Sequence, residues 1–152
     1  MASNWSKTFL KVAKAFADQS SCVKRKVGAV LVNDLRIVST GYNGTPSRLR
    51  NCNDIFTDKD SIGEYYGEKL NHHQFSEKYE IHAEQNCIAF AAKNGVKTEG
   101  CVLYVTTAPC VNCAKLIIAA GIKKVVFEED YKNEDGIELL ERSDVKCSKI
   151  CE

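Results

Sequence analysis

Two short motifs decide how this chain folds: His-Ala-Glu at residues 82–84 and Pro-Cys-Val-Asn-Cys at residues 109–113. His82, Cys110 and Cys113 carry the nitrogen and sulfur ligands that zinc prefers. Three protein ligands leave the fourth tetrahedral position open, which is typical of a catalytic zinc, whereas structural sites close all four positions. The pair of motifs therefore predicts a catalytic zinc centre. Either motif alone would be a weak signal, because paired cysteines and core histidines are common.

Each motif stands at the start of a segment with helical character. Residues 85–93 are rich in helix formers and Gly95 follows them, while residues 110–120 come after Pro109 and end at Gly121. Proline suits the first turn of a helix, and glycine suits its end. We therefore expect the metal ligands at two helix N-termini, where unpaired amides and the helix dipole favour thiolate and hydroxide.

Glu84 follows His82 by two residues, in the first turn of the first of these helices. Side chains two positions apart point to nearly opposite sides of a helix, so these two can converge only on a metal approached from the helix end. There Glu84 can exchange protons with a water molecule without binding the metal. His-x-Glu followed by Pro-Cys-x-x-Cys is typical of zinc-dependent nucleobase deaminases, which indicates hydrolytic deamination through a tetrahedral intermediate, with Glu84 as catalytic acid and base.

Length and charge limit the class of protein. The 152 residues suit one domain that spans residues 1–152. Its 21 basic and 20 acidic side chains give a net charge of +1, which argues against a protein that grips long phosphate backbones. The chain shows no long apolar run and no amino-terminal signal pattern. We expect a small ligand, with neither a membrane nor a nucleic acid as partner.

The eight cysteines, in a chain without an export signal, indicate a reducing, cytoplasmic setting rather than a disulfide framework. Two of them belong to the zinc motif. Four others stand outside any motif, and we expect them to be buried apolar groups or free thiols: Cys87, Cys101, Cys147 and Cys151.

Apolar patterns predict the remaining elements. Strands are expected at residues 27–32, 37–40, 102–106 and 125–127, and further helices at residues 5–16 and 134–142. The first two strands would form a hairpin around Asn33-Asp34, and the first helix would bury Trp5, Phe9, Val12, Ala13 and Phe16. The segment after residue 142 is too polar to assign. This order predicts a three-layer α/β/α fold, with a central mixed sheet flanked by helices on both faces.

Four segments carry a resemblance to a known family: Lys-Val-Gly-Ala-Val at residues 26–30, Gly-Tyr-Asn-Gly-Thr-Pro at 41–46, Ile-His-Ala-Glu-Gln-Asn at 81–86 and Thr-Ala-Pro-Cys-Val-Asn-Cys-Ala-Lys at 107–115. With them the chain resembles, over nearly its whole length, the deoxycytidylate (dCMP) deaminases of the cytidine deaminase-like superfamily. The zinc motifs mark the superfamily. The loop at 41–46, followed by a long insert from Arg48 to Lys78, narrows the resemblance to this family. It implies a zinc-dependent hydrolysis of dCMP to dUMP in pyrimidine deoxynucleotide metabolism.

The resemblance also implies substrate contacts. Asn43 would lie near the sugar, and the backbone at Thr107 and Ala108 would face the amino group that is lost. Taken alone, Asn43 between two glycines would be assigned to a turn. A monophosphate needs cationic or amide donors, and the best candidates precede the first strand, with Tyr131 as a weaker one: Ser21, Lys24, Arg25 and Lys26.

Some members of the family that the chain resembles carry a second, structural zinc. The same site here would pin the insert at residues 48–78. Its candidate ligands come from three regions of the chain, namely Cys22, Cys52, His72, His73 and Glu80. The sequence does not decide which of the two histidines would bind.

The resemblance further implies a homo-oligomer, with a hexamer favoured, and control by deoxynucleoside triphosphates with Mg²⁺. In this control dCTP would activate and dTTP would inhibit. The regulatory nucleotide would lie near Gly44, Phe90 and Lys93.

The sequence leaves two alternatives open. A deaminase of cytosine or adenine in RNA or single-stranded DNA shares both motifs, although the near-neutral charge and the loop at residues 41–46 disfavour it. A zinc-stabilised binding module without catalysis is the second, which Glu84 and the missing fourth ligand disfavour. Free cytidine deaminases usually have a cysteine at the position of His82, which disfavours them as well.

Overall fold

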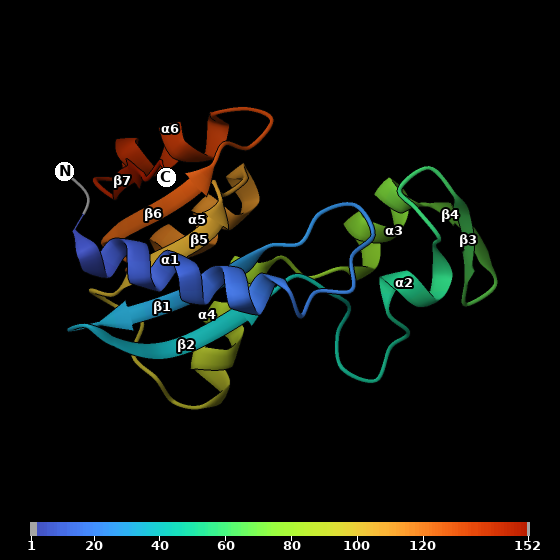
Figure 1. Ribbon diagram of the computed structural model, residues 1–152, viewed down its shortest axis with the longest axis horizontal. Coiled ribbons are helices and arrows are strands. Elements are labelled where there is room, and N and C mark those ends of the chain that lie inside the picture. The colour runs from blue at the N-terminus through green and yellow to red at the C-terminus, as the bar shows by residue number, and fades with distance from the viewer. Residues whose placement is uncertain (1–2, 152) are drawn as a thin grey trace.

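A five-stranded mixed sheet forms the centre of the molecule in the computed structural model, which describes residues 3–151 (Figure 1). Its spatial order is β2-β1-β5-β6-β7. The strands are β1 (Gly28–Asn33), β2 (Arg36–Tyr42), β5 (Val102–Thr107), β6 (Lys124–Glu129) and β7 (Lys146–Lys149). β1 pairs antiparallel with β2 and β5, whereas β5, β6 and β7 are parallel. The carboxyl ends of β5 and β6 therefore meet at one edge, where α/β sheets usually bind ligands.

Helices cover both faces of the sheet. α1 (Asn4–Ala17) lies across one face (Figure 1), where Phe9, Leu10 and Ala13 pack against apolar side chains of β1, β5 and β6. The opposite face shares its core with α4 (Ala83–Lys93), α5 (Val111–Ala119) and α6 (Asp135–Arg142). The expected three-layer α/β/α fold is confirmed. Within residues 3–151, no helix has the length and apolar character needed to cross a membrane.

Three details differ from the sequence-based expectations. The hairpin turns at Asp34 and Leu35, one residue later than expected, and both residues have positive φ angles, 49° and 59°, as a type I′ turn requires. Trp5 is 51% exposed and stacks on Phe9 instead of being buried. The polar segment after residue 142 forms the edge strand β7, and an edge strand tolerates polar side chains because only one side of it is paired.

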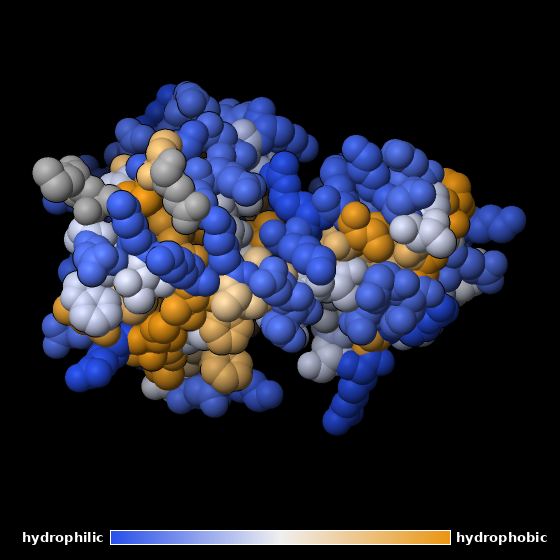
Figure 2. Space-filling model, viewed as in Figure 1, coloured by the Kyte–Doolittle hydropathy of each residue, from blue (hydrophilic) through white to orange (hydrophobic). Residues whose placement is uncertain are grey.

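The insert at residues 48–78 forms a small unit beside the main body (Figure 1). It contains α2 (Cys52–Ile55), β3 (Ile62–Tyr65), β4 (Glu68–Asn71) and α3 (His72–Tyr79). Hydrophilic side chains border the notch between the two parts (Figure 2). Phe75 packs edge-on against Phe56 and Tyr65 in the core of the insert, and Cys22 of the main body enters this core. A two-stranded hairpin is marginally stable alone, and here the shared core with α2, α3 and Cys22 supports it.

Two glycines allow the helices that carry the motifs to approach their neighbours. A Cβ atom on Gly41 in β2 would lie 2.5 Å from the carbonyl oxygen of Ala83, at the start of α4. A Cβ atom on Gly136 in α6 would overlap the carbonyl oxygen of Pro109, just before α5. Both contacts are with backbone, which cannot swing aside, so any side chain at these positions would displace the start of α4 or α5.

Candidate active site

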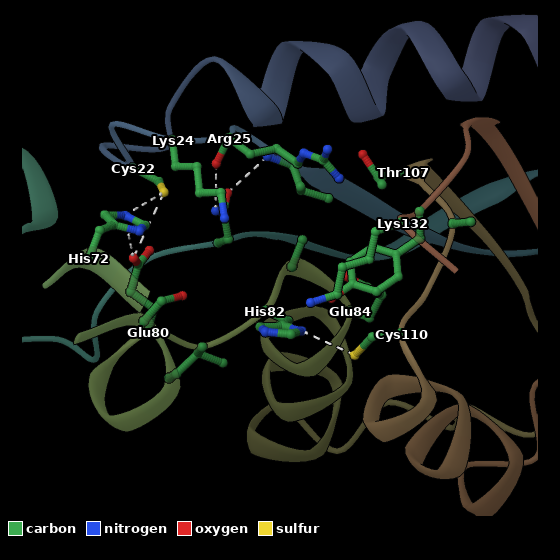
Figure 3. Close-up of a pocket in the computed structure, with 17 residues that line it drawn as sticks. Cys22, Lys24, Arg25, His72, Glu80, His82, Glu84, Thr107, Cys110 and Lys132 are labelled. Carbon is green, nitrogen blue, oxygen red and sulfur yellow. Dashed lines mark hydrogen bonds and ion pairs between the residues drawn. The ribbon is translucent and has the colours of Figure 1, made fainter. Parts of the chain in front are cut away.

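A cavity of about 280 Å³ lies between the main body and the insert (Figure 3). Its wall comes from the loop between α1 and β1, the end of the insert, the starts of α4 and α5, and the segments at the ends of β5 and β6. The cavity thus opens at the sheet edge that the topology favours for ligands. Two clusters of metal-ligating side chains border it, one around His82 and one around Cys22.

The first cluster consists of His82, Cys110 and Cys113, whose ligand atoms all lie within 4.8 Å of one another. The Nδ1 atom of His82 is 3.2 Å from the Sγ atom of Cys113 and 3.6 Å from that of Cys110. A tetrahedral zinc ion with its usual bond lengths would hold nitrogen and sulfur about 3.5 Å apart. The three side chains grouped by the sequence motifs therefore fit a zinc ion in both spacing and donor type.

The ligands sit at helix starts. His82 is the N-cap of α4 and Cys110 is the N-cap of α5. The backbone N–H of His82 donates to Oε1 of Gln85 (2.8 Å), which fixes the entry of the chain into α4. A hydrogen bond from Cys113 holds the pKa of the Cys110 thiol far below its usual range. One thiolate is therefore available as a metal ligand at neutral pH.

Glu84 lies in the first turn of α4 and borders the cavity beside the first cluster, where it is only 5% exposed. Burial raises the pKa of its carboxyl group, because a carboxylate loses hydration in such a place. The raised pKa brings the group closer to the range in which it can both accept and release a proton. Glu84 thus lies beside the first cluster without belonging to its ligand group.

The second cluster consists of Cys22, Cys52, His72 and Glu80, and their side chains are almost fully buried. The Nε2 atom of His72 lies 3.5 Å from the Sγ atom of Cys22 and 3.4 Å from Oε1 of Glu80. The Sγ atom of Cys22 is 3.8 Å from Oε1 of Glu80. The two separations from His72 match the roughly 3.4–3.6 Å between ligands of a tetrahedral zinc ion, and the separation between Cys22 and Glu80 is slightly longer.

A buried oxygen without a partner also fits a metal in the second cluster. Among the described residues, Oε2 of Glu80 is buried and makes no hydrogen bond. Burying an unpaired oxygen is unfavourable, and a bound cation would satisfy it. Of the two histidines that the sequence left open, His72 joins the cluster, whereas His73 is exposed and lies outside it. Adjacent residues at the start of α3 point in different directions, so only one of the two can face the cluster.

Most of the expected substrate residues border the cavity: Lys24, Arg25, Asn43, Thr107, Ala108 and Tyr131. Ser21 and Lys26 do not belong to its wall. A run of basic residues in a loop is well solvated, so only part of it needs to face one site.

Lys132 also borders the cavity, and its Nζ atom lies 5.6 Å from the centre of the Tyr131 ring. Sequence reasoning missed Lys132, and its position next to Tyr131 was the only signal.

The residues expected to bind a regulatory nucleotide do not border this cavity. Gly44 is buried and pairs with Ile81 before α4 begins. Phe90 and Lys93 are exposed in the last turns of α4.

The fold and the first cluster together define a class of protein. The sheet lies between helical layers, and two helix starts bring His82, Cys110 and Cys113 together and place the buried Glu84 at the same cavity. This ligand set with a neighbouring glutamate is typical of the zinc-dependent deaminases that act on nucleobases. Comparison with known proteins identifies the family. Residues 3–129 match the family model of the cytidine and deoxycytidylate deaminase zinc-binding region, and the chain belongs to this family.

The chain is also similar to individual proteins named as deoxycytidylate deaminases. The chain is 39% identical over 155 residues to the deoxycytidylate deaminase of enterobacteria phage T4. This alignment covers 85% of the present chain and 80% of the phage protein. It is 33% identical over 146 residues to the deoxycytidylate deaminase of Saccharomyces cerevisiae, covering 95% of this chain and 44% of the yeast protein. The crystal structure of the dCMP deaminase from cyanophage S-TIM5 in complex with dCMP and dUMP superposes with a TM-score of 0.81 at 32% identity, over 99% of both chains. The resemblance carried by the four sequence segments is thereby confirmed.

Proposed function

We propose that this protein hydrolyses dCMP to dUMP and ammonia, as a cytoplasmic enzyme of pyrimidine deoxynucleotide metabolism. The observation that carries the proposal is the shared cavity, which His82 and Cys110 of the first cluster and Glu84 border. Lys24, Arg25 and Lys132 border the same space. The part beside the first cluster and Glu84 suits a base that is to be hydrolysed, and the part beside the three cations suits a phosphate. The names of the phage and yeast relatives support the same substrate.

Glu84 carries the protons in the proposed reaction. His82, Cys110 and Cys113 would hold a zinc ion, which when bound would lower the pKa of a coordinated water molecule from about 15.7 towards about 7. Glu84 removes a proton from this water and passes it to the ring nitrogen beside C4, while the oxygen adds to C4. Glu84 then takes the remaining proton of the added hydroxyl group and passes it to the amino group, so that ammonia leaves as the C4 carbonyl forms. The atoms of dCMP and water are recovered in dUMP and ammonia, and the enzyme is unchanged.

Groups away from the reacting carbon hold the nucleotide. We place the sugar against Asn43 and the leaving amino group against the backbone at Thr107 and Ala108. The phosphate then lies among the remaining polar groups of the wall, namely Lys24, Arg25, Tyr131 and Lys132. Charge-assisted hydrogen bonds to phosphate are about twice as strong as neutral ones, so the phosphate is expected to contribute most of the binding free energy.

Product analysis tests the function. Zinc-loaded protein is incubated separately with dCMP, CMP and deoxycytidine, with dCTP and Mg²⁺ present, and the products are separated by chromatography. Rapid conversion of dCMP alone is the expected result, since it requires both the chemistry and the 5′-phosphate. If none of the three reacts, RNA and single-stranded DNA substrates are tested next. Failure there as well would favour a zinc-stabilised binding module.

Arg25→Ala is expected to raise KM for dCMP by roughly 10- to 100-fold, because one hydrogen bond to a charged group is worth about 1.5–3 kcal/mol. Deoxycytidine lacks the phosphate, so its kcat/KM should stay the same. Steady-state kinetics with both substrates make the measurement. Lys26→Ala is the matched control, because Lys26 is a neighbouring cation outside the cavity wall. An unchanged KM for dCMP in Arg25→Ala would remove Arg25 from the phosphate site.

We also propose a structural zinc in the second cluster. Cys52→Ala is expected to remove one zinc ion per chain and to destabilise the protein by about 4 kcal/mol when free zinc stands a thousandfold above its Kd. The reason is that the metal joins Cys22 of the main body to Cys52 and His72 of the insert and to Glu80 just after it. Metal analysis and thermal unfolding make the measurement, with Cys101→Ala as a buried cysteine outside both clusters. One zinc per chain in a fully active wild-type preparation would contradict this site.

We further propose a homo-oligomer, with a hexamer favoured, that dCTP with Mg²⁺ activates and dTTP inhibits. Apolar side chains on β2 and α4 support association, because Ile37 and Tyr42 are each 41% exposed and Phe90 is 50% exposed. Gly44, Phe90 and Lys93 are our candidates for the regulatory nucleotide. Light scattering measures the oligomer, and rates with each triphosphate measure the regulation; a flat response to both would exclude it.

A further inference from the structure

Ser20 lies between α1 and β1 and joins two segments that border the cavity without bordering it itself. Its side chain is 3% exposed. The hydroxyl group donates to the carbonyl oxygen of Asn43 (2.8 Å) and accepts from the backbone N–H of Cys22 (3.2 Å). Ser20 therefore connects a ligand of the second cluster to a residue of the proposed substrate site.

The side chain of Asn43 continues this connection. Its Nδ2 atom donates to the carbonyl oxygen of Arg25 (2.9 Å), and its Oδ1 atom accepts from the backbone N–H of Val27 (2.9 Å). The amide thus holds the basic loop, residues 24–27, by its backbone. Cys22 stands only two residues before Lys24, so a displacement of Cys22 would move the cations that face the cavity.

A third connection runs through Gly44 and Ile81. The N–H of Gly44 donates to the carbonyl oxygen of Ile81 (3.1 Å). In return, the N–H of Ile81 donates to the carbonyl oxygen of Gly44 (2.7 Å). Ile81 stands between Glu80 of the second cluster and His82 of the first. In the close-up, Cys22, His72 and Glu80 lie at one end of the cavity, His82 lies further along it, and Cys110 lies beyond His82 (Figure 3).

We propose that a metal ion in the second cluster and the 5′-phosphate of a nucleotide in the cavity strengthen each other's binding, and that Ser20 is the positioning residue that couples them. The coupling rests on the proposed function, because it needs both the second metal and the nucleotide site. With the metal bound, Cys22 is fixed and the basic loop is held towards the phosphate. Without it, the nucleotide must order this loop itself, which weakens its apparent affinity.

Coupled binding is reciprocal, so the nucleotide must also strengthen metal binding. The zinc affinity of the second cluster is measured by competition with a chromophoric chelator, alone, with dUMP, and with deoxyuridine as the ligand without phosphate. Cys52→Ala retains only the first-cluster zinc and so identifies the signal of the second. We expect dUMP to raise this zinc affinity by about fivefold or more, the lower end of common coupling strengths. Deoxyuridine should leave it unchanged.

Ser20→Ala is expected to reduce the effect of dUMP to less than about twofold and to raise KM for dCMP by about fivefold, with kcat and the KM for deoxycytidine unchanged. Ser20→Thr keeps a hydroxyl group and should preserve the coupling. Ser39→Ala is the matched control: Ser39 is also 3% exposed and donates to a backbone carbonyl, but this carbonyl belongs to Cys87, which does not border the cavity. A loss of stability alone would affect both alanine variants and would leave the coupling intact.

The wild-type protein alone can overturn the coupling, so the test does not depend on whether a variant folds. An enzyme that turns over dCMP but whose zinc affinity is the same with and without dUMP would overturn it and leave the proposed function standing. Full coupling in Ser20→Ala would overturn the role of Ser20. A protein that neither converts dCMP nor binds dUMP would overturn the proposed function, and the coupling with it.

Discussion

Replacing Glu84 with glutamine is expected to lower kcat for dCMP by about 10²- to 10⁴-fold, the range for loss of a general acid and base. Glutamine has nearly the same shape, but it can neither take a proton from water nor return one to the amino group. Because Glu84 borders the cavity and is not part of the first ligand group, bound zinc should not change. Steady-state kinetics and metal analysis on the same preparation separate the two effects.

Glu77→Gln is the matched control for this experiment. Glu77 is an exposed carboxylate in α3 outside the cavity wall, so its variant should have the kcat of the wild type. Should Glu84→Gln retain zinc and also retain full turnover, proton transfer would have to be assigned to another group.

Cys113→Ala is expected to abolish measurable turnover of dCMP and to remove the zinc of the first cluster. Only two of the three ligands would remain, and loss of a direct ligand should weaken zinc binding by more than the roughly 100-fold that loss of an outer partner costs. Cys113 is fully buried, so no exposed group can take its place. Metal content is expected to fall by one zinc ion per chain, the ion that Cys52→Ala retains.

Zinc readdition distinguishes a lost site from a lost fold. Chelator-treated wild-type protein should regain activity when zinc returns, whereas Cys113→Ala should stay inactive at the same zinc concentration. Cys101→Ala again serves as the control, since Cys101 is equally buried and belongs to neither cluster. Turnover by Cys113→Ala at the wild-type rate would exclude the first cluster as the catalytic centre.

Local signals made the first cluster predictable. His82 and Cys110 stand at helix starts, and Gly95 and Gly121 follow the ends of the same helices with positive φ angles of 68° and 75°. A cap, a helix and a terminating glycine are encoded within one short segment. The ligand positions therefore follow from neighbouring residues, without knowledge of the tertiary structure.

The second cluster and Ser20 were not predictable from spacing in this way. The four ligands come from separate segments, and only the folding of the insert against the loop after α1 brings them together. The choice of His72 over His73 depends on the orientation of α3, which the sequence does not reveal. A buried serine that bonds two backbone groups leaves no pattern at all, because its partners are peptide atoms present at every position.

The close contact between Gly136 and the carbonyl oxygen of Pro109 bears on where a working fragment of this protein could end. The family match stops at residue 129, and a chain cut there would still carry every ligand of both clusters. It would lack α6, which backs the peptide that leads into Cys110, and the apolar side of α5 would face water. A fragment that preserves the catalytic geometry therefore has to include α6, beyond the boundary that sequence similarity marks.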